Sequence, residues 1–371
     1  MSAKDYTASP LSRACLFAYA VLIVYASLYP FSGWQFENIA AFSAQISQWP
    51  RYWSQFDAIV NVLGYMPLGV LIVFSLYPVV ARGWSLLLAT LGGCAMSLLM
   101  ESVQYFLPSR VTSLLDLITN AGGCLLGALI GVCLLPFILE SGRLHQLRTQ
   151  WLYPNSAREL VVIGLWPLAQ IFPHAFLFGH GQILPIISLW CEDYLDVSID
   201  LSAVLRNDIE LSPEMYLLSE TIITACGCSG AILIGLSLLN RRAPKMILAS
   251  LLLVASVAVR ALSSALMFQP ENAFLWLTPS AQGGILISAI MLYGFSFAPN
   301  HAQRRLAILL LSLSLLMVNL IPSNPYFLHT LQAMVQGKML NFYGAAQFLS
   351  VVWPFIALWY LVGSRPSERN L

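Results

Sequence analysis

Long stretches of apolar residues recur along the whole chain, separated by short polar segments. A helix needs about 20 mostly apolar residues to cross a bilayer, because backbone groups in hydrocarbon must hydrogen-bond within their own segment. None of the stretches has the alternating pattern of a barrel strand. The sequence therefore predicts an all-α, polytopic membrane bundle of about ten spans. These are 13–30, 57–78, 84–107, 114–137, 159–178, 215–239, 245–268, 273–298, 306–321 and 341–362, with Pro279 interrupting the eighth.

Composition supports lipid as the main solvent of this chain. Hydrophobic residues make up 58% of the 371 residues and charged residues only 9%, whereas about 25% is usual for a soluble protein. The net charge of +1 gives no sign of the basic surface that nucleic-acid binding requires. We therefore expect the bilayer as the main partner and no nucleic acid.

The distribution of basic residues predicts the orientation. With the ten spans above, most of the 18 Lys and Arg residues fall on one side of the membrane, and those on the other are Arg51, Arg110, Arg206 and Lys338. Positively charged loops stay in the cytoplasm, so both termini are predicted to be cytoplasmic. Residues 1–139 then form a four-helix domain, 140–158 a cytoplasmic linker, and 159–371 a domain of about six helices.

Ionisable and amide side chains gather in the second, third and fourth predicted spans. Such groups are costly in hydrocarbon, so they usually face the bundle interior and mark a site. Residues three or four apart share one helix face, and here all such pairs lie at the outer ends of their helices. The pairs are Asp57 with Asn61, Glu101 with Gln104, and Asp116 with Asn120, with Arg110 in the turn between the last two. We expect these seven side chains to meet in one place.

Two interpretations of this cluster remain open. Buried polar groups can simply hold helices together, with hydrogen bonds worth about 0.6 to 2 kcal/mol each, while Gly122, Gly123 and Gly127 allow close helix approach. Against this, three acids share one arginine. At least one acid must therefore be protonated, bound to a metal, or paired with a group brought in from outside. An excess of acidic over basic side chains in one cluster favours catalysis or ligand binding.

The order D-x-x-x-N, P-L-G, E-x-x-Q, R, D-x-x-x-N-x-x-G resembles the VanZ-like family over about residues 57–131. The residues that carry the resemblance are Asp57, Asn61, Pro67, Gly69, Glu101, Gln104, Arg110, Asp116, Asn120 and Gly123. The resemblance implies a multi-pass protein of the bacterial plasma (inner) membrane with a role in the cell envelope. Founding members of that family are associated with resistance to the glycopeptide teicoplanin. The resemblance implies no defined mechanism and does not reach the last six predicted helices.

The favoured hypothesis is an enzyme that acts on an amphipathic lipid or lipid-linked substrate at the outer leaflet. Paired carboxylates can divide general acid and base duties, so Asp57, Glu101 and Asp116 are the candidate catalytic residues. Arg110 would hold a phosphate or carboxylate. The oxygen ligands would suit a magnesium or calcium ion held by the three acids. The candidate substrate-binding residues are Asn61, Gln104, Arg110 and Asn120.

Two alternatives come from other classes of protein. One is a transporter or flippase for an envelope lipid or precursor, which broken helices would support. Glu220 and Arg260 could line its path, although we favour the structural alternative that they pair with each other. The other is a non-catalytic envelope binding or sensing protein. His174 and His180 lie six residues apart and would not share a helix face, so packing is expected of them rather than ligation.

Overall fold

The computed structural model describes residues 9–29, 31–36, 49, 53–108, 110, 112–140, 143–153, 156–207, 209, 211–268, 273–322 and 340–363. Within these ranges every regular element is helical, and eight helices are long and apolar enough to cross a membrane. The predicted all-α membrane fold is therefore confirmed. Both chain termini lie outside the described residues, so their predicted cytoplasmic location stays a prediction. The chain divides into two compact units, Met1–Gln150 and Trp151–Leu371, and the predicted domain bounds stay a prediction.

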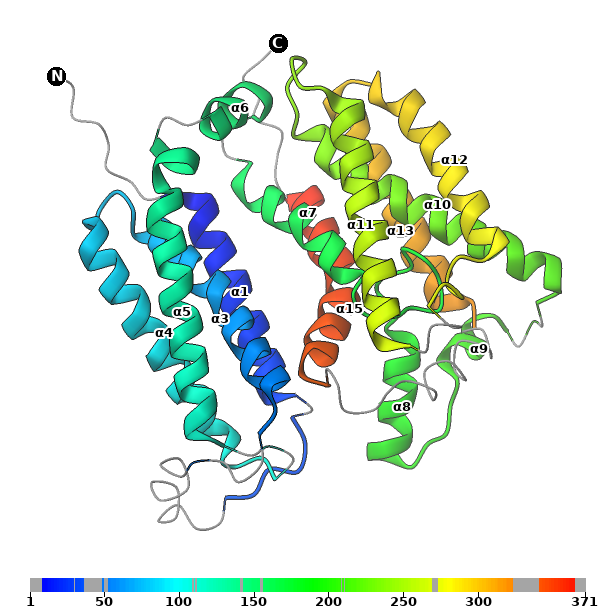
Figure 1. The fold of residues 1–371 in the computed structure, drawn as a ribbon. Helices are drawn as coiled ribbons and strands as arrows, with labels where there is room; N and C mark the ends of the chain where they lie inside the picture. The colour runs from blue at the N-terminus through cyan, green and yellow to red at the C-terminus, as the bar shows by residue number, and fades with distance from the viewer. Residues whose placement is uncertain are drawn as a thin grey trace. The chain divides into compact units, whose positions relative to one another are not determined.

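Unit 1 is a bundle of four long helices that lie side by side (Figure 1). They are α1 (Pro10–Leu28), α3 (Gln55–Leu76), α4 (Arg82–Gln104) and α5 (Leu114–Leu135). A π-helical turn (Pro136–Glu140) follows α5, and α6 (Arg143–Trp151) crosses into unit 2.

The closest packing in unit 1 joins α3 to α5, and glycines make it possible. A Cβ added to Gly127 would lie 2.7 Å from the carbonyl carbon of Met66, and one added to Gly123 would lie 2.8 Å from the Cα of Val62. A Cβ on Gly122 would meet nothing within 4 Å. Small residues let membrane helices approach this closely. Of the glycines expected to serve packing, Gly123 and Gly127 do so, whereas Gly122 faces open space.

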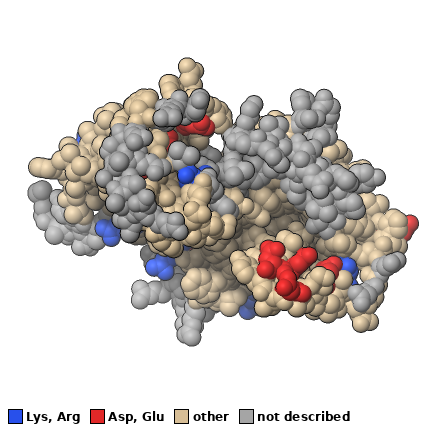
Figure 2. All heavy atoms as spheres, turned by 90° about the horizontal axis from the view of Figure 1, so that it is seen from below, with Lys and Arg blue, Asp and Glu red and all other residues tan. Residues whose placement is uncertain are grey.

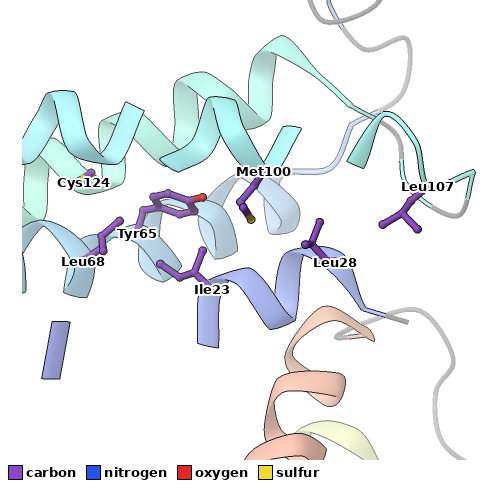
Figure 3. Packing of buried hydrophobic residues seen from close by; sticks show 7 residues of the cluster. All are labelled: Ile23, Leu28, Tyr65, Leu68, Met100, Leu107 and Cys124. Carbon is purple, nitrogen blue, oxygen red and sulfur yellow. The ribbon is translucent and has the colours of Figure 1, made fainter. Parts of the chain in front are cut away.

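Apolar side chains from α1, α3, α4 and α5 fill the centre of unit 1 (Figure 3). Tyr65 lies in the middle of this cluster, is 6% exposed and directs its hydroxyl toward the Met100 side chain. The cluster consists of Ile23, Leu28, Tyr65, Leu68, Met100, Leu107 and Cys124. It supports the polar residues at the end of the bundle where α4 ends and α5 begins.

Unit 2 is built around α10 (Pro213–Ser237), which packs against α7, α11, α12 and α13. Most of the residues of α10 are buried, which makes it the central helix of the unit. The other helices are α7 (Ala157–Ala169), α8 (Leu184–Leu195), α9 (Leu201–Leu205), α11 (Lys245–Met267), α12 (Pro279–Ser296), α13 (Asn300–Leu320) and α15 (Leu340–Gly363). The exposed acidic residues in and after α8 are Glu192, Asp193, Asp196 and Asp200, and the largest of the acidic patches visible in Figure 2 contains several such side chains.

Two of the ten predicted spans differ from the structure. The span 159–178 was wrong as a continuous helix, because α7 ends at Ala169 after only 13 residues. The span 273–298 was wrong at its start, because α12 begins at Pro279 with Thr278 as its N-cap. Proline fits the first helical position, where its missing N–H has no partner to lose. Neither α7 nor α12 is among the eight helices suited to crossing a membrane.

The chain between α7 and α8 is non-helical yet largely buried. Arg260 donates hydrogen bonds to the carbonyls of Phe172 (2.8 Å) and His174 (3.0 Å), and Ser263 donates one to the carbonyl of Ile171. Asn319 accepts from the backbone N–H groups that open α8 and donates to the carbonyl of Gly181. Side chains from α11 and α13 therefore satisfy the backbone groups that a helix would otherwise have paired.

Candidate functional site

Glu101 is the most deeply buried of the acids whose side chains are described in unit 1. It lies in the last turn of α4 and is only 3% exposed. Its Oε2 accepts a hydrogen bond from the backbone N–H of Ser113 at 3.1 Å, which ties the end of α4 to the start of α5. Glu101 is also close enough to Asp116 for the two charges to interact. A buried carboxylate therefore lies beside a second acid.

Asp116 lies in the first turn of α5 and is half-buried. Its Oδ1 accepts a hydrogen bond from the Asn61 amide at 2.8 Å, and its backbone N–H donates to the Ser113 hydroxyl. The acid is thus held from two directions, by an amide of α3 and by the cap of its own helix. Negative charge is also favourable at a helix N-terminus, because the helix dipole is positive there.

Asp57 occupies the matching position on α3 but is exposed. Its backbone N–H donates to the Ser54 hydroxyl at 3.0 Å, and that hydroxyl donates to its Oδ2 at 2.6 Å. These contacts form the N-terminal cap of α3 and lie at the surface of the unit. The electrostatic interaction of Asp57 with Asp116 places it at the edge of the acid cluster.

Asn120 lies one turn deeper than Asp116, between α5 and α4. Its amide donates to the Ser97 hydroxyl at 3.0 Å, and both side chains are buried. The Tyr65 hydroxyl interacts with Ser97 and with Glu101 but has no hydrogen bond of good geometry, and the Oδ1 of Asn120 also has no partner. A buried polar layer therefore lies directly beneath the two acids.

Arg110 and Gln104 face α1 instead of the acids. Arg110 donates to the carbonyls of Tyr29 (2.5 Å) and Ala26 (3.4 Å), and Gln104 donates to the carbonyl of Ser27 at 2.8 Å. These carbonyls belong to the C-terminal end of α1, which has no helical partners for them and attracts positive charge. Burial lowers the pKa of the Arg110 guanidinium from its usual value.

The seven candidate residues thus form two groups rather than one. Asn61, Glu101, Asp116 and Asn120 come together between α3, α4 and α5, with Asp57 at their edge, while Gln104 and Arg110 anchor α1. The spacing of these residues in the sequence identified which helix faces carry them, but it did not identify the groups to which Gln104 and Arg110 bind. Within the described ranges, no three His, Cys, Asp or Glu side chains are grouped so that they could hold a metal ion. The acid cluster therefore does not fit the magnesium or calcium site considered from the sequence.

Sequence reasoning missed the serines that shape the site. Ser54 and Ser113 are the N-caps of α3 and α5, and S-x-x-D is a signature of a helix start. Both helices in fact begin with S-x-x-D-x-x-x-N-x-x-G, from Ser54 to Gly64 and from Ser113 to Gly123. This internal repeat accounts for two parallel helices that present an acid and an amide at the same end of the unit.

The buried charges of unit 2 have separate partners. Glu220 accepts a hydrogen bond from the Thr278 hydroxyl at 2.6 Å, whereas Arg260 binds the carbonyls of the non-helical segment. The pairing of these two charges, which the sequence favoured, is thus replaced by two separate sets of contacts. The rings of His174 and His180 meet edge to face, 4.9 Å apart, because the segment that carries them is not a helix.

Comparison with known protein families gives one finding, on unit 1. Residues 15–136 match the family model described as VanZ/LLP1, which confirms the resemblance that the polar motifs indicated. The match covers about a third of the chain and begins earlier than residues 57–131, so that it takes in most of α1. Inclusion of α1 agrees with the contacts that Gln104 and Arg110 make to its C-terminal end. Curated proteins and solved structures give no match.

Proposed function

We propose that unit 1 acts on the headgroup of a lipid or lipid-linked envelope molecule at the outer leaflet of the bacterial plasma membrane. The observation that carries the proposal is the buried carboxylate of Glu101 beside Asp116, with no basic side chain bound to either acid in the described structure. Burial of an ionisable group without a counter-charge costs stability. Such a cost is typical of functional sites and hard to explain by packing alone.

In this proposal the two acids divide the proton transfers. Asp116 is half-buried and held by Asn61, so it is the better placed to receive a proton from an incoming group. Glu101, held by the Ser113 backbone N–H, would donate a proton to the leaving group. Asn120 and Ser97 would support the substrate from below. Asp57 bonds to Ser54, the N-cap of α3, at the edge of the site, and we give it a smaller role than the sequence suggested.

Complementation of a bacterial strain that lacks the protein tests this proposal. We expect Glu101→Gln and Asp116→Asn to reduce protection against glycopeptides at least tenfold, because general acid or base groups contribute about 10²–10⁴-fold in rate. Each variant keeps one oxygen that can accept the hydrogen bond from Ser113 or Asn61, so the fold should survive. Susceptibility, envelope-lipid composition and the amount of protein in the membrane are the readouts.

The matched control is Glu192→Gln, which removes an exposed acid of unit 2 and should leave protection unchanged. Loss of protection with normal amounts of protein, together with accumulation of one lipid species, supports the proposal and identifies the substrate. Normal protection by both variants contradicts it and would favour a non-catalytic binding protein. Disappearance of the variants from the membrane would mean that the acids hold the helices together.

A second candidate function is transport of an envelope lipid or precursor. One observation favours it: the interruption between α7 and α8, since transporters often build their binding sites from broken helices. The same strains separate the two functions. An enzyme defect leaves a chemically unprocessed lipid, whereas a transport defect leaves a lipid of normal chemistry in the wrong leaflet, which a membrane-impermeant headgroup label detects.

A further inference from the structure

The acid cluster of unit 1 has more hydrogen-bond acceptors than donors. Asp57, Glu101 and Asp116 receive hydrogen bonds from hydroxyl, amide and backbone N–H groups, and none of these donors carries a charge. Arg110, the nearest arginine in sequence, donates to α1 carbonyls instead. No basic side chain among the described residues is bound to these acids, so a negatively charged ligand would meet several acids without a cation to offset them.

The buried layer beneath the acids adds a second and independent observation. The Oδ1 of Asn120 has no hydrogen-bond partner although the side chain is only 7% exposed, and the buried hydroxyl of Tyr65 has only its loose contact with Ser97. Asn120 follows Asp116 by one helical turn, and its amide bonds to Ser97, one turn before Glu101. Buried polar atoms without partners are rare in native proteins. The Asn120 oxygen lies on α5 one turn below Asp116, and the Tyr65 hydroxyl reaches from α3 toward Met100 of α4, so both belong to the buried layer beneath the two acids.

An aromatic rim lies at the same end of the unit, just beyond α4. Tyr105 follows Glu101 by one turn, and its ring contacts Phe106 at 5.4 Å; Phe106 in turn contacts Phe36 at 5.4 Å. Phe36 is 70% exposed, and the backbone N–H of Gln35 donates to the carbonyl of Phe106. Aromatic faces attract cations and typically lie at the headgroup level of a membrane.

We propose that this site takes an amphiphile whose headgroup carries a protonated amine, an inference that rests on the proposed function. An ammonium group supplies positive charge to the acids and three N–H donors to Glu101, Asp116 and the unpartnered Asn120 oxygen. The acyl chains would remain in lipid while the aromatic rim contacts the headgroup. A phosphate group held by Arg110, as the sequence suggested, has no place in this arrangement. A quaternary ammonium headgroup carries the charge but lacks the donors.

Binding of defined lipids to the purified full-length protein tests the inference. Native mass spectrometry from detergent micelles would compare phosphatidylethanolamine, phosphatidylcholine and phosphatidylglycerol, with free ethanolamine added in a separate arm. We expect the wild-type protein to bind phosphatidylethanolamine most tightly. Glu101→Gln and Asp116→Asn should each weaken that binding about tenfold, or about 1.4 kcal/mol, while Glu192→Gln leaves it unchanged. If free ethanolamine displaces phosphatidylethanolamine from the wild-type protein, the amine is recognised without the lipid tails.

Three outcomes would overturn the inference: tighter binding of phosphatidylglycerol by the wild type, equal binding of all three lipids, or unchanged phosphatidylethanolamine binding by both acid variants. The thermal unfolding temperature of each variant shows whether lost binding reflects lost folding. Failure here is distinct from failure of the proposed function. Suppose that Glu101→Gln abolishes protection in cells but binds phosphatidylethanolamine as well as wild type does. The acids then act on another headgroup: the proposed function stands, and the inference that the headgroup carries an amine is wrong.

Discussion

Replacing Gly127 with alanine is expected to stop α3 and α5 from packing and to remove most of the protein from the membrane. The added Cβ would overlap the carbonyl oxygen of Met66 and lie 2.7 Å from its carbonyl carbon. Overpacking usually costs about 1–3 kcal/mol. Here the obstacle is backbone rather than a side chain that can turn away, so we expect the upper end of that range. Membrane abundance and the thermal unfolding temperature of purified protein measure the effect.

Gly122→Ala is the matched control, five residues before Gly127 on the same helix. Nothing lies within 4 Å of the position its Cβ would take, so unfolding temperature and abundance should equal those of wild type. Equal behaviour of Gly127→Ala and Gly122→Ala would mean that α3 and α5 are further apart than described. The site would then be more open too, since Asn61 of α3 reaches Asp116 of α5 only across this contact.

Arg260→Ala is expected to destabilise unit 2 by about 3 kcal/mol or more. Arg260 is 2% exposed and binds two carbonyls of the non-helical segment between α7 and α8. Leaving a buried carbonyl without a partner costs about 1–3 kcal/mol, and the substitution strands two. The guanidinium also lies 5.9 Å from the ring centre of Trp276, a contact that is lost as well. Thermal unfolding of the purified protein measures the change.

Two further variants show which property of Arg260 stabilises unit 2. Arg305→Ala removes an exposed arginine of α13 and should change the unfolding temperature little. Arg260→Lys keeps the positive charge but loses the planar fork that reaches both carbonyls, so an intermediate loss is expected. A wild-type unfolding temperature for Arg260→Ala would show that the non-helical segment is held without this side chain.

The long helices could be predicted from the sequence because lipid imposes a simple requirement of length and apolarity. The interruption after Ala169 was not predicted although Pro173 lies in this segment, because membrane helices also accommodate proline, as α7 does at Pro167. The side chains that satisfy its buried backbone groups, Arg260 and Asn319, lie far away in sequence. Pro279 was recognised as an interruption, but its role as the first residue of a helix depends on Thr278, which caps α12.

The candidate site was predictable to the level of helix faces. Spacing correctly placed Asn61 and Asp116 where they could meet, and the hydrogen bond between them joins α3 to α5. Spacing could not show that Arg110 turns toward α1, because the free carbonyls of that helix end are a property of the folded bundle. The S-x-x-D caps at Ser54 and Ser113 were visible in the sequence and would have indicated a structural role for Asp57.

The thermal unfolding temperature of Glu101→Gln, measured beside its activity, tests most directly whether the acid cluster is a working site. Glutamine can still accept the hydrogen bond from Ser113 while removing a buried acid that has no basic partner. We therefore expect an unfolding temperature equal to or above that of wild type, together with loss of protection in cells. The contradicting result is a fall of several degrees in the unfolding temperature, about 1–2 kcal/mol for a unit of this size, together with the loss of protection. Glu101 would then be a structural residue.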